Sequence, residues 1–119
     1  WGGDIAPAAV DLARHNAELA GVDDCIRFEV ADMRDFRRDS QYGQLVTNPP
    51  YGERLMDRAA AETLYRELGR VWQHLPDGWR TLVLSSHTEF ERTFGRPADK
   101  KRKLYNGMLK CDLFMYGNV

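Results

Sequence analysis

The sequence predicts an α/β fold with a mostly parallel sheet, helices on both faces and an antiparallel hairpin at the C-terminal end. First, stretches of period-two hydrophobicity alternate with stretches of helical period, which is typical of a parallel sheet covered by helices. Second, residues 81–84 are a continuous apolar run, as in a strand buried on both faces. Third, Asn106-Gly107 separates two strand-like runs, which is the strongest short-range signal of a β-hairpin.

The first thirty residues predict a strand, a helix and a second strand. Residues 1–5 have the character of a strand end that runs into a turn. The helix begins near Pro7, whose missing N–H costs nothing in a first helical turn, and it ends at Gly21. Residues 26–30 alternate between apolar and polar side chains, as a half-exposed strand near a sheet edge does.

The middle of the chain predicts a short strand and a long helix. After a polar loop over residues 31–43, the apolar strand 45–47 stops at Asn48-Pro49-Pro50, because proline cannot donate a hydrogen bond to a neighbouring strand. A helix then covers roughly residues 60–75. Its apolar face consists of Leu64, Leu68, Val71, Trp72 and Leu75.

The last third predicts a strand, a short helix and a hairpin. Pro76-Asp77-Gly78 ends the long helix, and the buried strand 81–84 follows. Phe90 and Phe94 lie one helical turn apart in a short helix. Residues 101–105 and 108–116 then flank Asn106-Gly107 as the two strands of the hairpin.

Length and composition limit the classes of protein to which the chain can belong. The 119 residues allow one domain, and a hydrophobic fraction of 43% argues against a disordered chain. No run approaches the ~18 consecutive apolar residues of a membrane span. Cys25 and Cys111 show no CxxC pattern, which favours a reducing cytoplasm over a disulfide framework. The three histidines lack the spacing of metal ligands, so no metal site is predicted.

The net charge of −1 conceals a basic segment. Residues 96–103 have a local charge of +4 and can contact a phosphate backbone, with an ordinary solvated surface as the alternative. Alternation along a strand places Lys101 and Lys103 on the opposite face from Lys100 and Arg102. The basic residues of the segment are Arg96, Lys100, Lys101, Arg102 and Lys103.

Two acidic residues follow predicted strands, where open α/β sheets bind ligands. Asp4 can accept hydrogen bonds from both hydroxyls of a ribose, and the alternative is that it caps the helix near Pro7. Asp32 can accept from the exocyclic amine of a purine while Met33 packs on the purine ring. The alternative for Asp32 is an aspartate that only forms a turn.

The tetrapeptide Asn48-Pro49-Pro50-Tyr51 is the most specific motif in the chain. Its prolines fix the backbone and expose a carbonyl oxygen, and Asn48 adds a side-chain carbonyl. Two rigid acceptors can bind the two hydrogens of a planar amino group and direct its nitrogen toward an electrophile. Tyr51 offers a flat face on which a base can stack, worth about 1–3 kcal/mol. The alternative is a rigid turn with a packed tyrosine.

The motifs together resemble a known family. Asn-Pro-Pro-Tyr after a strand, in an α/β chain that ends in a hairpin, resembles the Rossmann-like class I S-adenosylmethionine-dependent methyltransferases that act on amino groups. Residues 3–5, 48–55 and 98–107 resemble the catalytic domain of THUMP-containing 23S rRNA guanine-N2 methyltransferases, and the similarity covers nearly the whole chain. The Gly52-Glu53-Arg54 extension and the lysine-rich segment are more specific to that family than the tetrapeptide.

The resemblance implies a set of cofactor contacts. Asp4 would bind the ribose of S-adenosylmethionine, and Ile5 would pack on its adenine. Asp32 would accept from the adenine amine, with Met33 beside the ring.

The resemblance also implies the substrate contacts. Asn48 and the Pro49 carbonyl would hold the guanine amino group, Pro50 would complete the rigid motif, and Tyr51 would stack on the flipped base. Arg54 and the five basic residues of the segment 96–103 would contact RNA.

The sequence departs from the family at its start. The chain begins at Trp1, and neither the glycine-rich loop that holds the methionine end of the cofactor nor a THUMP domain is present. We therefore expect residues 1–119 to be the C-terminal portion of a single methyltransferase catalytic domain whose N-terminal part is missing, with a THUMP domain upstream.

The expected reaction is methyl transfer from S-adenosylmethionine to the exocyclic N2 amine of a guanine in 23S ribosomal RNA. We expect it to take place in the cytoplasm, without a membrane partner. Two alternatives remain: a tRNA or DNA amino methyltransferase of the same fold, and a non-catalytic RNA-binding module. A glycine-rich strand–helix turn upstream of Trp1 would favour an enzyme.

Overall fold

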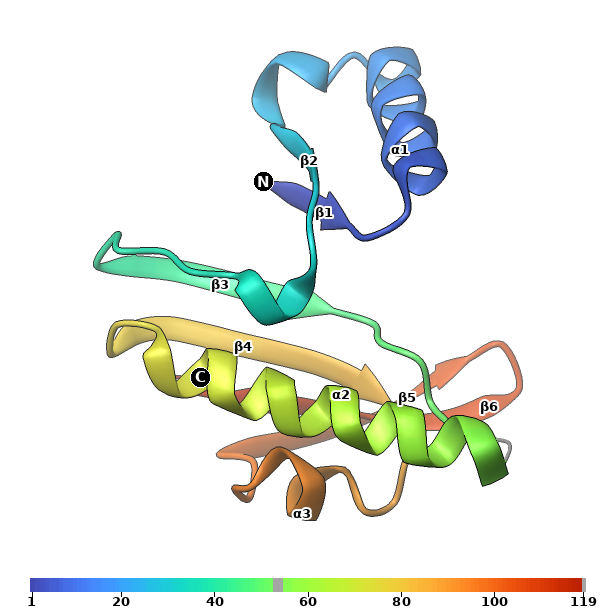
Figure 1. Cartoon of the computed structure of the whole chain (residues 1–119), viewed down its shortest axis with the longest axis vertical. Helices are drawn as coiled ribbons and strands as arrows, with labels where there is room; N and C mark the ends of the chain where they lie inside the picture. Colours follow the sequence, from blue (N-terminus) through green and yellow to red (C-terminus); the bar gives the residue numbers. More distant parts are fainter. Residues whose placement is uncertain (53–54, 119) are drawn as a thin grey trace. The chain divides into compact units, whose positions relative to one another are not determined.

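The computed structural model describes residues 1–52 and 55–118 (Figure 1). The chain forms two compact units, residues 1–36 and residues 37–119, which we call the N-terminal unit and the C-terminal unit. Among the described residues, no helix combines the length and the apolar character that a membrane crossing requires.

The N-terminal unit is a small parallel β-α-β arrangement. β1 (Gly2–Asp4) and β2 (Phe28–Val30) pair in parallel, and α1 (Pro7–Ala20) connects them. α1 begins at a proline, as predicted, and ends where Gly21 adopts a φ of 73°, a left-handed conformation that costs glycine little. Its buried residues, Val10 and Ala17, lie two helical turns apart on one face.

The C-terminal unit is a four-stranded sheet with two helices. Its strands are β3 (Tyr42–Thr47), β4 (Gly78–Ser85), β5 (Lys100–Asn106) and β6 (Leu109–Tyr116), and its helices are α2 (Leu55–His74) and α3 (Phe90–Phe94). The strand order is β3-β4-β6-β5. β3 and β4 are parallel, whereas β6 is antiparallel to both β4 and β5.

Both helices of the C-terminal unit cover the same face of its sheet. The Tyr65 hydroxyl of α2 lies 3.1 Å from Ser85 Oγ on β4. Phe90 of α3 stacks on Phe114 of β6, with 4.5 Å between ring centroids. Because Phe114 pairs with Val83, two residues before Ser85, all three strand residues point to one face. The core of the unit therefore lies between this face and the two helices.

The hairpin of β5 and β6 extends past the end of β4. The last residue pair between β4 and β6 is Ser85 with Asp112. Beyond it, β5 and β6 continue through the pairs Leu104–Cys111, Tyr105–Lys110 and Asn106–Leu109. The hairpin tip therefore stands at the carboxyl edge of β3 and β4, since β6 runs antiparallel to them.

The turn of this hairpin lies one residue later than the sequence predicts. Asn106 pairs with Leu109, so the two loop residues are Gly107 and Met108 rather than Asn106 and Gly107. Gly107 has a φ of 64°, and no non-glycine residue in the described part of the chain has a positive φ. This matches a Gly-X turn, which needs a positive φ only at its first position. The shift leaves Asn106 in a strand position.

The structure confirms the α/β class, the order of the elements and the terminal antiparallel hairpin. Boundaries differ: β3 begins at Tyr42, α2 begins at Leu55, and the predicted polar loop contains a short 3-10 turn over Met33–Asp35. β4 is fully buried on the face that carries Val83, whereas Leu82 and Leu84 on the other face are half-buried. The expectation of a strand fully buried on both faces is therefore wrong for this strand.

Candidate active site

The Asn48–Tyr51 loop leaves the sheet at the end of β3, as the two prolines require. The Tyr51 hydroxyl donates to Asn48 Oδ1 at 2.6 Å. Asn106 Nδ2 of the hairpin donates to the same Tyr51 oxygen at 3.1 Å. The loop is thereby fixed to the hairpin tip across 55 residues of sequence, and Asn48 Oδ1 keeps one lone pair for a further donor.

A chain of hydrogen bonds from the core reaches the same loop. The backbone N–H of His87 donates to Ser85 Oγ at 3.1 Å. Ser85 Oγ lies 3.1 Å from the hydroxyl of Tyr65, which donates to the Pro50 carbonyl. Tyr65 is fully buried, at 0% exposure, so its hydroxyl needs these partners. The chain holds the Pro50 carbonyl toward the core.

The Pro49 carbonyl, by contrast, accepts no hydrogen bond from any residue in the described ranges. Proline fixes φ on both sides of this peptide, so anchoring the Pro50 carbonyl also limits the direction of the Pro49 carbonyl. Asn48 Oδ1 and the Pro49 oxygen can thus each accept a further hydrogen bond, as far as the described residues show.

A pocket of about 680 Å³ lies beside this loop. Its lining residues are Pro50, Tyr51, Gly52, Asp57, Ala60, Ala61 and Leu64. One wall is the loop itself, and the other is the first part of α2. Small and apolar side chains around an aromatic ring suit a planar apolar ligand such as a nucleobase.

Burial raises the pKa of Tyr51 and the pKa of Tyr65 above the usual value for a tyrosine hydroxyl. Both hydroxyls therefore stay protonated at neutral pH and can donate the hydrogen bonds described above. Neither is placed to act as a base, and the one carboxylate among the described lining residues of the pocket is Asp57.

In the N-terminal unit, Asp4 and Asp32 follow the ends of adjacent strands. Asp4 Oδ1 accepts from the backbone N–H of Ala6 at 2.9 Å, in the turn before α1. Ala6 is the N-cap residue of that helix and no side chain caps it, so the alternative of a capping aspartate is wrong. Asp4 Oδ2 has no partner among the described residues, and Ile5 beside it is 66% exposed. Asp4 and Ile5 are therefore free to contact a ligand.

Asp32 is already engaged by its own turn. Both of its carboxylate oxygens accept from Arg34, with the closest contact at 2.6 Å from Nη2. The backbone N–H of Arg34 also donates to Asp32, and these bonds to Arg34 lower the pKa of the carboxyl. The turn-forming role foreseen as an alternative is thus present, with Met33 half-buried in the same turn. Their role toward a cofactor stays a prediction.

The basic residues divide by their partners. Arg96 pairs with Asp99 at 2.9 Å, and Lys101 pairs with Glu91 at 3.0 Å. The other three, Lys100, Arg102 and Lys103, are exposed and have no ion pair with a residue the structure describes. The strand register confirms that Lys101 and Lys103 face away from Lys100 and Arg102. Arg54, also predicted to contact RNA, lies outside the described residues.

Sequence reasoning missed Tyr65, Ser85 and Asn106 as residues of this site. Tyr65 has the spacing of an ordinary core residue of α2, and Asn106 looks like a turn residue. No local signal distinguishes them, since Tyr65 and Asn106 contact the motif from distant parts of the chain and Ser85 reaches it only through Tyr65. No group of three or more His, Cys, Asp or Glu in the described ranges is arranged to hold a metal ion.

We expect Tyr65→Phe to lower the rate of the methyl transfer that the motifs predict, at saturating RNA, about fivefold, since one buried hydrogen bond contributes about 1 kcal/mol. The affinity for RNA should stay unchanged, because Tyr65 acts only through the Pro50 carbonyl. Single-turnover kinetics and RNA titrations on the full-length protein measure the two effects separately.

Tyr116→Phe is the matched control. Tyr116 is also 0% exposed, and its hydroxyl donates to the Arg96 carbonyl at 2.9 Å, away from the motif. Both variants should lose about 1 kcal/mol of unfolding free energy. A rate loss of equal size in both variants would contradict a positioning role for Tyr65.

Comparison with known proteins places the chain among methyltransferases. Residues 1–114 match the family model described as "RMKL-like, methyltransferase domain". The Bacillus subtilis (strain 168) protein YpsC, provisionally named an RNA methyltransferase, is 43% identical over 95% of this chain and 29% of its own length. The ribosomal RNA large subunit methyltransferase K/L of Shewanella baltica (strain OS185) is 40% identical over 98% of this chain and 16% of its own length.

Solved structures agree with this placement. A protein of Clostridium difficile 630 described as a possible methylase superposes with a TM-score of 0.94 at 47% identity, over 99% of this chain and 31% of that one. SMU.472, provisionally assigned as a methyltransferase and complexed with SAH, superposes with a TM-score of 0.92 at 44% identity, over 99% of this chain and 31% of that one. A protein of Listeria monocytogenes str. 4b F2365, described as a predicted N6-adenine-specific DNA methylase, superposes with a TM-score of 0.87 at 44% identity, over 98% of this chain and 30% of that one.

The chain spans less than a third of the length of the curated relatives given above. The part that it spans contains the Asn48–Tyr51 loop and the sheet that positions it. Since the family model covers nearly all of the sequence, the chain belongs to the RMKL-like methyltransferase domain family.

Proposed function

We propose that this chain contributes to methyl transfer from S-adenosylmethionine to the exocyclic N2 amine of a guanine in 23S ribosomal RNA. The observation that carries the proposal is the anchored Asn48–Tyr51 loop. It carries the acceptor oxygens of Asn48 and Pro49, and its next residues, Pro50 and Tyr51, line a pocket, in a chain of a methyltransferase family.

The N-terminal unit supports the choice of cofactor. SMU.472 is complexed with SAH, the product that S-adenosylmethionine leaves after methyl transfer. In this chain Asp4 has a free carboxylate oxygen for a ribose hydroxyl, next to the exposed apolar side chain of Ile5 for the adenine. Asp32 and Met33 would complete the set. When bound, S-adenosylmethionine supplies a methyl group on a positively charged sulfur.

The C-terminal unit would hold and orient the amine. Asn48 Oδ1 and the Pro49 oxygen each accept one hydrogen of the amino group, which keeps its nitrogen lone pair directed at the methyl carbon. The nitrogen–carbon bond forms as the carbon–sulfur bond breaks, and the electron pair of that bond stays on sulfur. The extra proton on the nitrogen is then lost to water, so the site needs no strong base. Tyr51 stacks on the base, which must leave its stack to reach the site.

The names of the relatives support RNA as the substrate class, since one is a ribosomal RNA methyltransferase and another carries an RNA methyltransferase name. The basic strand β5 supports the same class through Lys100, Arg102 and Lys103, which are exposed and have no ion pair with a described residue. Guanine N2 and the 23S target rest on the resemblance of residues 98–107 to the guanine-N2 enzymes. A cytoplasmic location and an upstream THUMP domain remain parts of this proposal. Cys25 and Cys111 are both free thiols, which agrees with a reducing compartment such as the cytoplasm.

DNA adenine methylation is the second candidate, because the Listeria protein is described as a DNA methylase. Two acceptors that bind an amino group serve adenine N6 and guanine N2 equally well. The test is label transfer from S-adenosylmethionine by the full-length protein to ribosomal RNA, tRNA and DNA, followed by nucleoside analysis. Labelled N2-methylguanosine in 23S RNA supports the proposal, N6-methyladenine in DNA supports the second candidate, and RNA binding without label would indicate a non-catalytic module.

We expect reversal of the Lys100 and Arg102 charges to weaken RNA binding and to flatten its salt dependence by about one unit of slope per lost phosphate contact. Reversal at Lys101 and Lys103 should have a smaller effect, because Lys101 is paired with Glu91. Salt titrations of both double variants and of the wild type give the comparison. Equal slopes in all three proteins would show that the segment is an ordinary solvated surface.

A further inference from the structure

The hairpin overhang, residues 104–111, continues past the end of β4 at the edge where the Asn48–Tyr51 loop also lies. Three residue pairs of β5 and β6 extend beyond the last pair with β4. At about 3.3 Å per residue, the overhang rises roughly 10 Å above that edge. Beyond Asp112, β6 has no pairing with β4 along that edge.

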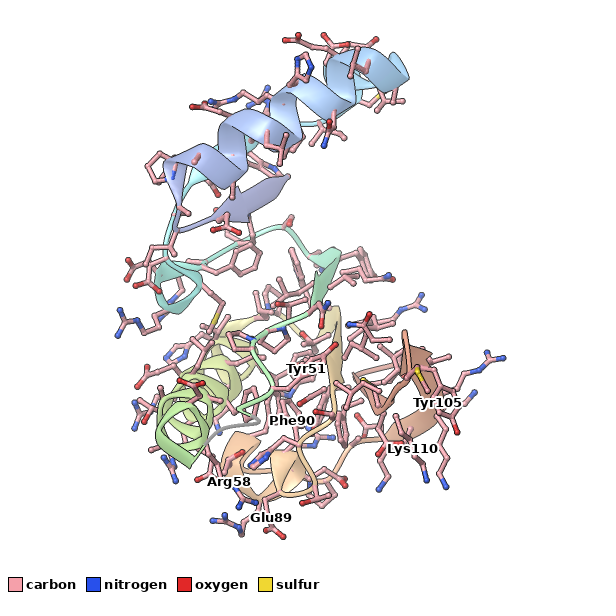
Figure 2. The ribbon with its side chains drawn as sticks, turned by 90° about the vertical axis from the view of Figure 1, so that its right-hand side faces the viewer. Tyr51, Arg58, Glu89, Phe90, Tyr105 and Lys110 are labelled. Carbon is pink, nitrogen blue, oxygen red and sulfur yellow. The ribbon has the colours of Figure 1, made fainter. Side chains whose placement is uncertain are left out.

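The two faces of the overhang carry different groups. Asn106 lies on one face and donates to the Tyr51 hydroxyl at 3.1 Å, so this face adjoins Tyr51. Tyr105 and Lys110 are a directly opposed pair on the other face, and Figure 2 shows them together on the hairpin. Met108 forms the turn between the faces.

The overhang is unusually apolar for an exposed segment. Tyr105 is 69% exposed and Met108 is 100% exposed. The segment contains no acidic residue, Lys110 lies opposite Tyr105, and Lys103 lies two residues before it on the same face. An exposed aromatic ring between lysines is the combination by which proteins bind single-stranded nucleic acids: the ring stacks on a base and the cations contact phosphates.

We propose that the hairpin overhang is a wedge that separates the target nucleotide of a single-stranded RNA segment from its neighbour. The target base lies on the Asn106 and Tyr51 side. The neighbouring base stacks on Tyr105 on the opposite side, with its phosphate at Lys110 and Met108 between the two bases. The proposal rests on the proposed function, because it takes the loop at Tyr51 as the site of the target base.

The wedge has an energetic role. A base of a single strand that leaves its stack loses its stacking energy, at most a few kcal/mol. Stacking of the neighbouring base on Tyr105 contributes about 1–3 kcal/mol and so offsets part of that loss. The hydrogen bond from Asn106 couples the overhang to the Tyr51 ring, so one rigid hairpin positions both contacts.

The test is binding of a 12-nucleotide single-stranded RNA by the full-length protein. The RNA carries one guanine next to 2-aminopurine, whose fluorescence is quenched when it stacks. Tyr105→Ala should weaken binding about 5- to 150-fold and abolish the quenching, whereas Tyr105→Phe should keep both within a factor of about three. Lys110→Ala should instead reduce the slope of log binding constant against log salt concentration by about 0.7, as the loss of one phosphate contact to a single strand does.

Tyr42→Ala is the matched control, since Tyr42 is 75% exposed at the start of β3, the opposite end of that strand from the loop. Loss of binding and quenching in Tyr105→Ala but not in Tyr42→Ala supports the wedge. Wild-type binding by Tyr105→Ala, or an equal loss in both variants, overturns it. The assay needs no methyl transfer, so failure of the wedge and failure of the proposed reaction can be distinguished.

Discussion

Asn48→Ala in the full-length protein is expected to lower the methyl-transfer rate about 10²- to 10³-fold while leaving RNA affinity nearly unchanged. Loss of one preorganised hydrogen-bonding group from a reaction centre has effects of this size. Asn48 Oδ1 is held at 2.6 Å from the Tyr51 hydroxyl, so its direction is set before the substrate arrives. Its contact with the amine matters most as the nitrogen gains positive charge, which places the loss in kcat rather than in binding. Single-turnover methylation at saturating RNA measures the loss.

Gln44→Ala provides the control for this variant, since Gln44 carries an exposed side-chain amide on β3, four residues before Asn48. Its rate should stay within a factor of about two of the wild type. If Asn48→Ala retained a rate of that order, Asn48 would be a turn residue only, and the amine would have to be held elsewhere.

Gly69→Ala is expected to lower the free energy of unfolding by about 3 kcal/mol, the upper range for overpacking a core. A Cβ atom at Gly69 would lie 2.0 Å from the Phe94 carbonyl oxygen, a backbone atom that cannot move independently of α3. Alanine favours the helix by about 1 kcal/mol over glycine, so helix propensity alone predicts the opposite sign. The clash dominates, because moving α3 away would separate Phe94 from Tyr116, now 4.2 Å apart between ring centroids.

Denaturant unfolding of Gly69→Ala against Gln73→Ala measures this effect. Gln73 is exposed on the same helix, one turn later, and its substitution should change stability by less than about 0.5 kcal/mol. A more stable Gly69→Ala protein would show that α3 does not pack closely on α2.

The sequence indicates those parts of the fold that have a local cause. Pro7 and Gly21 mark the ends of α1, and the two prolines after Thr47 end β3, because each acts on the backbone of its own segment. The Asn48–Tyr51 motif is visible for the same reason, since its prolines fix its shape. Periodicity located the helices but missed the start of α2 by five residues, because the first turn, at Leu55, carries no apolar repeat.

The supporting contacts of the site could not be predicted in this way. Tyr65 and Asn106 reach the motif from 15 and 55 residues away, and only the packed sheet brings them there. The hairpin turn shows the same limit. Asn-Gly is the preferred turn pair, yet the pairing of Asn106 with Leu109 moves the turn to Gly107-Met108. In that register the Asn106 side chain donates a hydrogen bond to the Tyr51 hydroxyl. Turn propensities cannot include this contact, because it depends on a residue 55 positions away.

The hydrogen bonds onto the loop give a criterion for judging other chains that contain the same tetrapeptide. Asn-Pro-Pro-Tyr is a short motif that can persist after activity is lost, because its prolines form a turn whether or not the site is active. In this chain a tyrosine fifteen residues after the second proline and an asparagine in the last strand position before the hairpin turn hold the loop, and we expect a fully active copy to keep them. Homologues that keep the tetrapeptide but replace both of these residues with apolar ones are expected to be degenerate copies, retained for binding rather than for turnover.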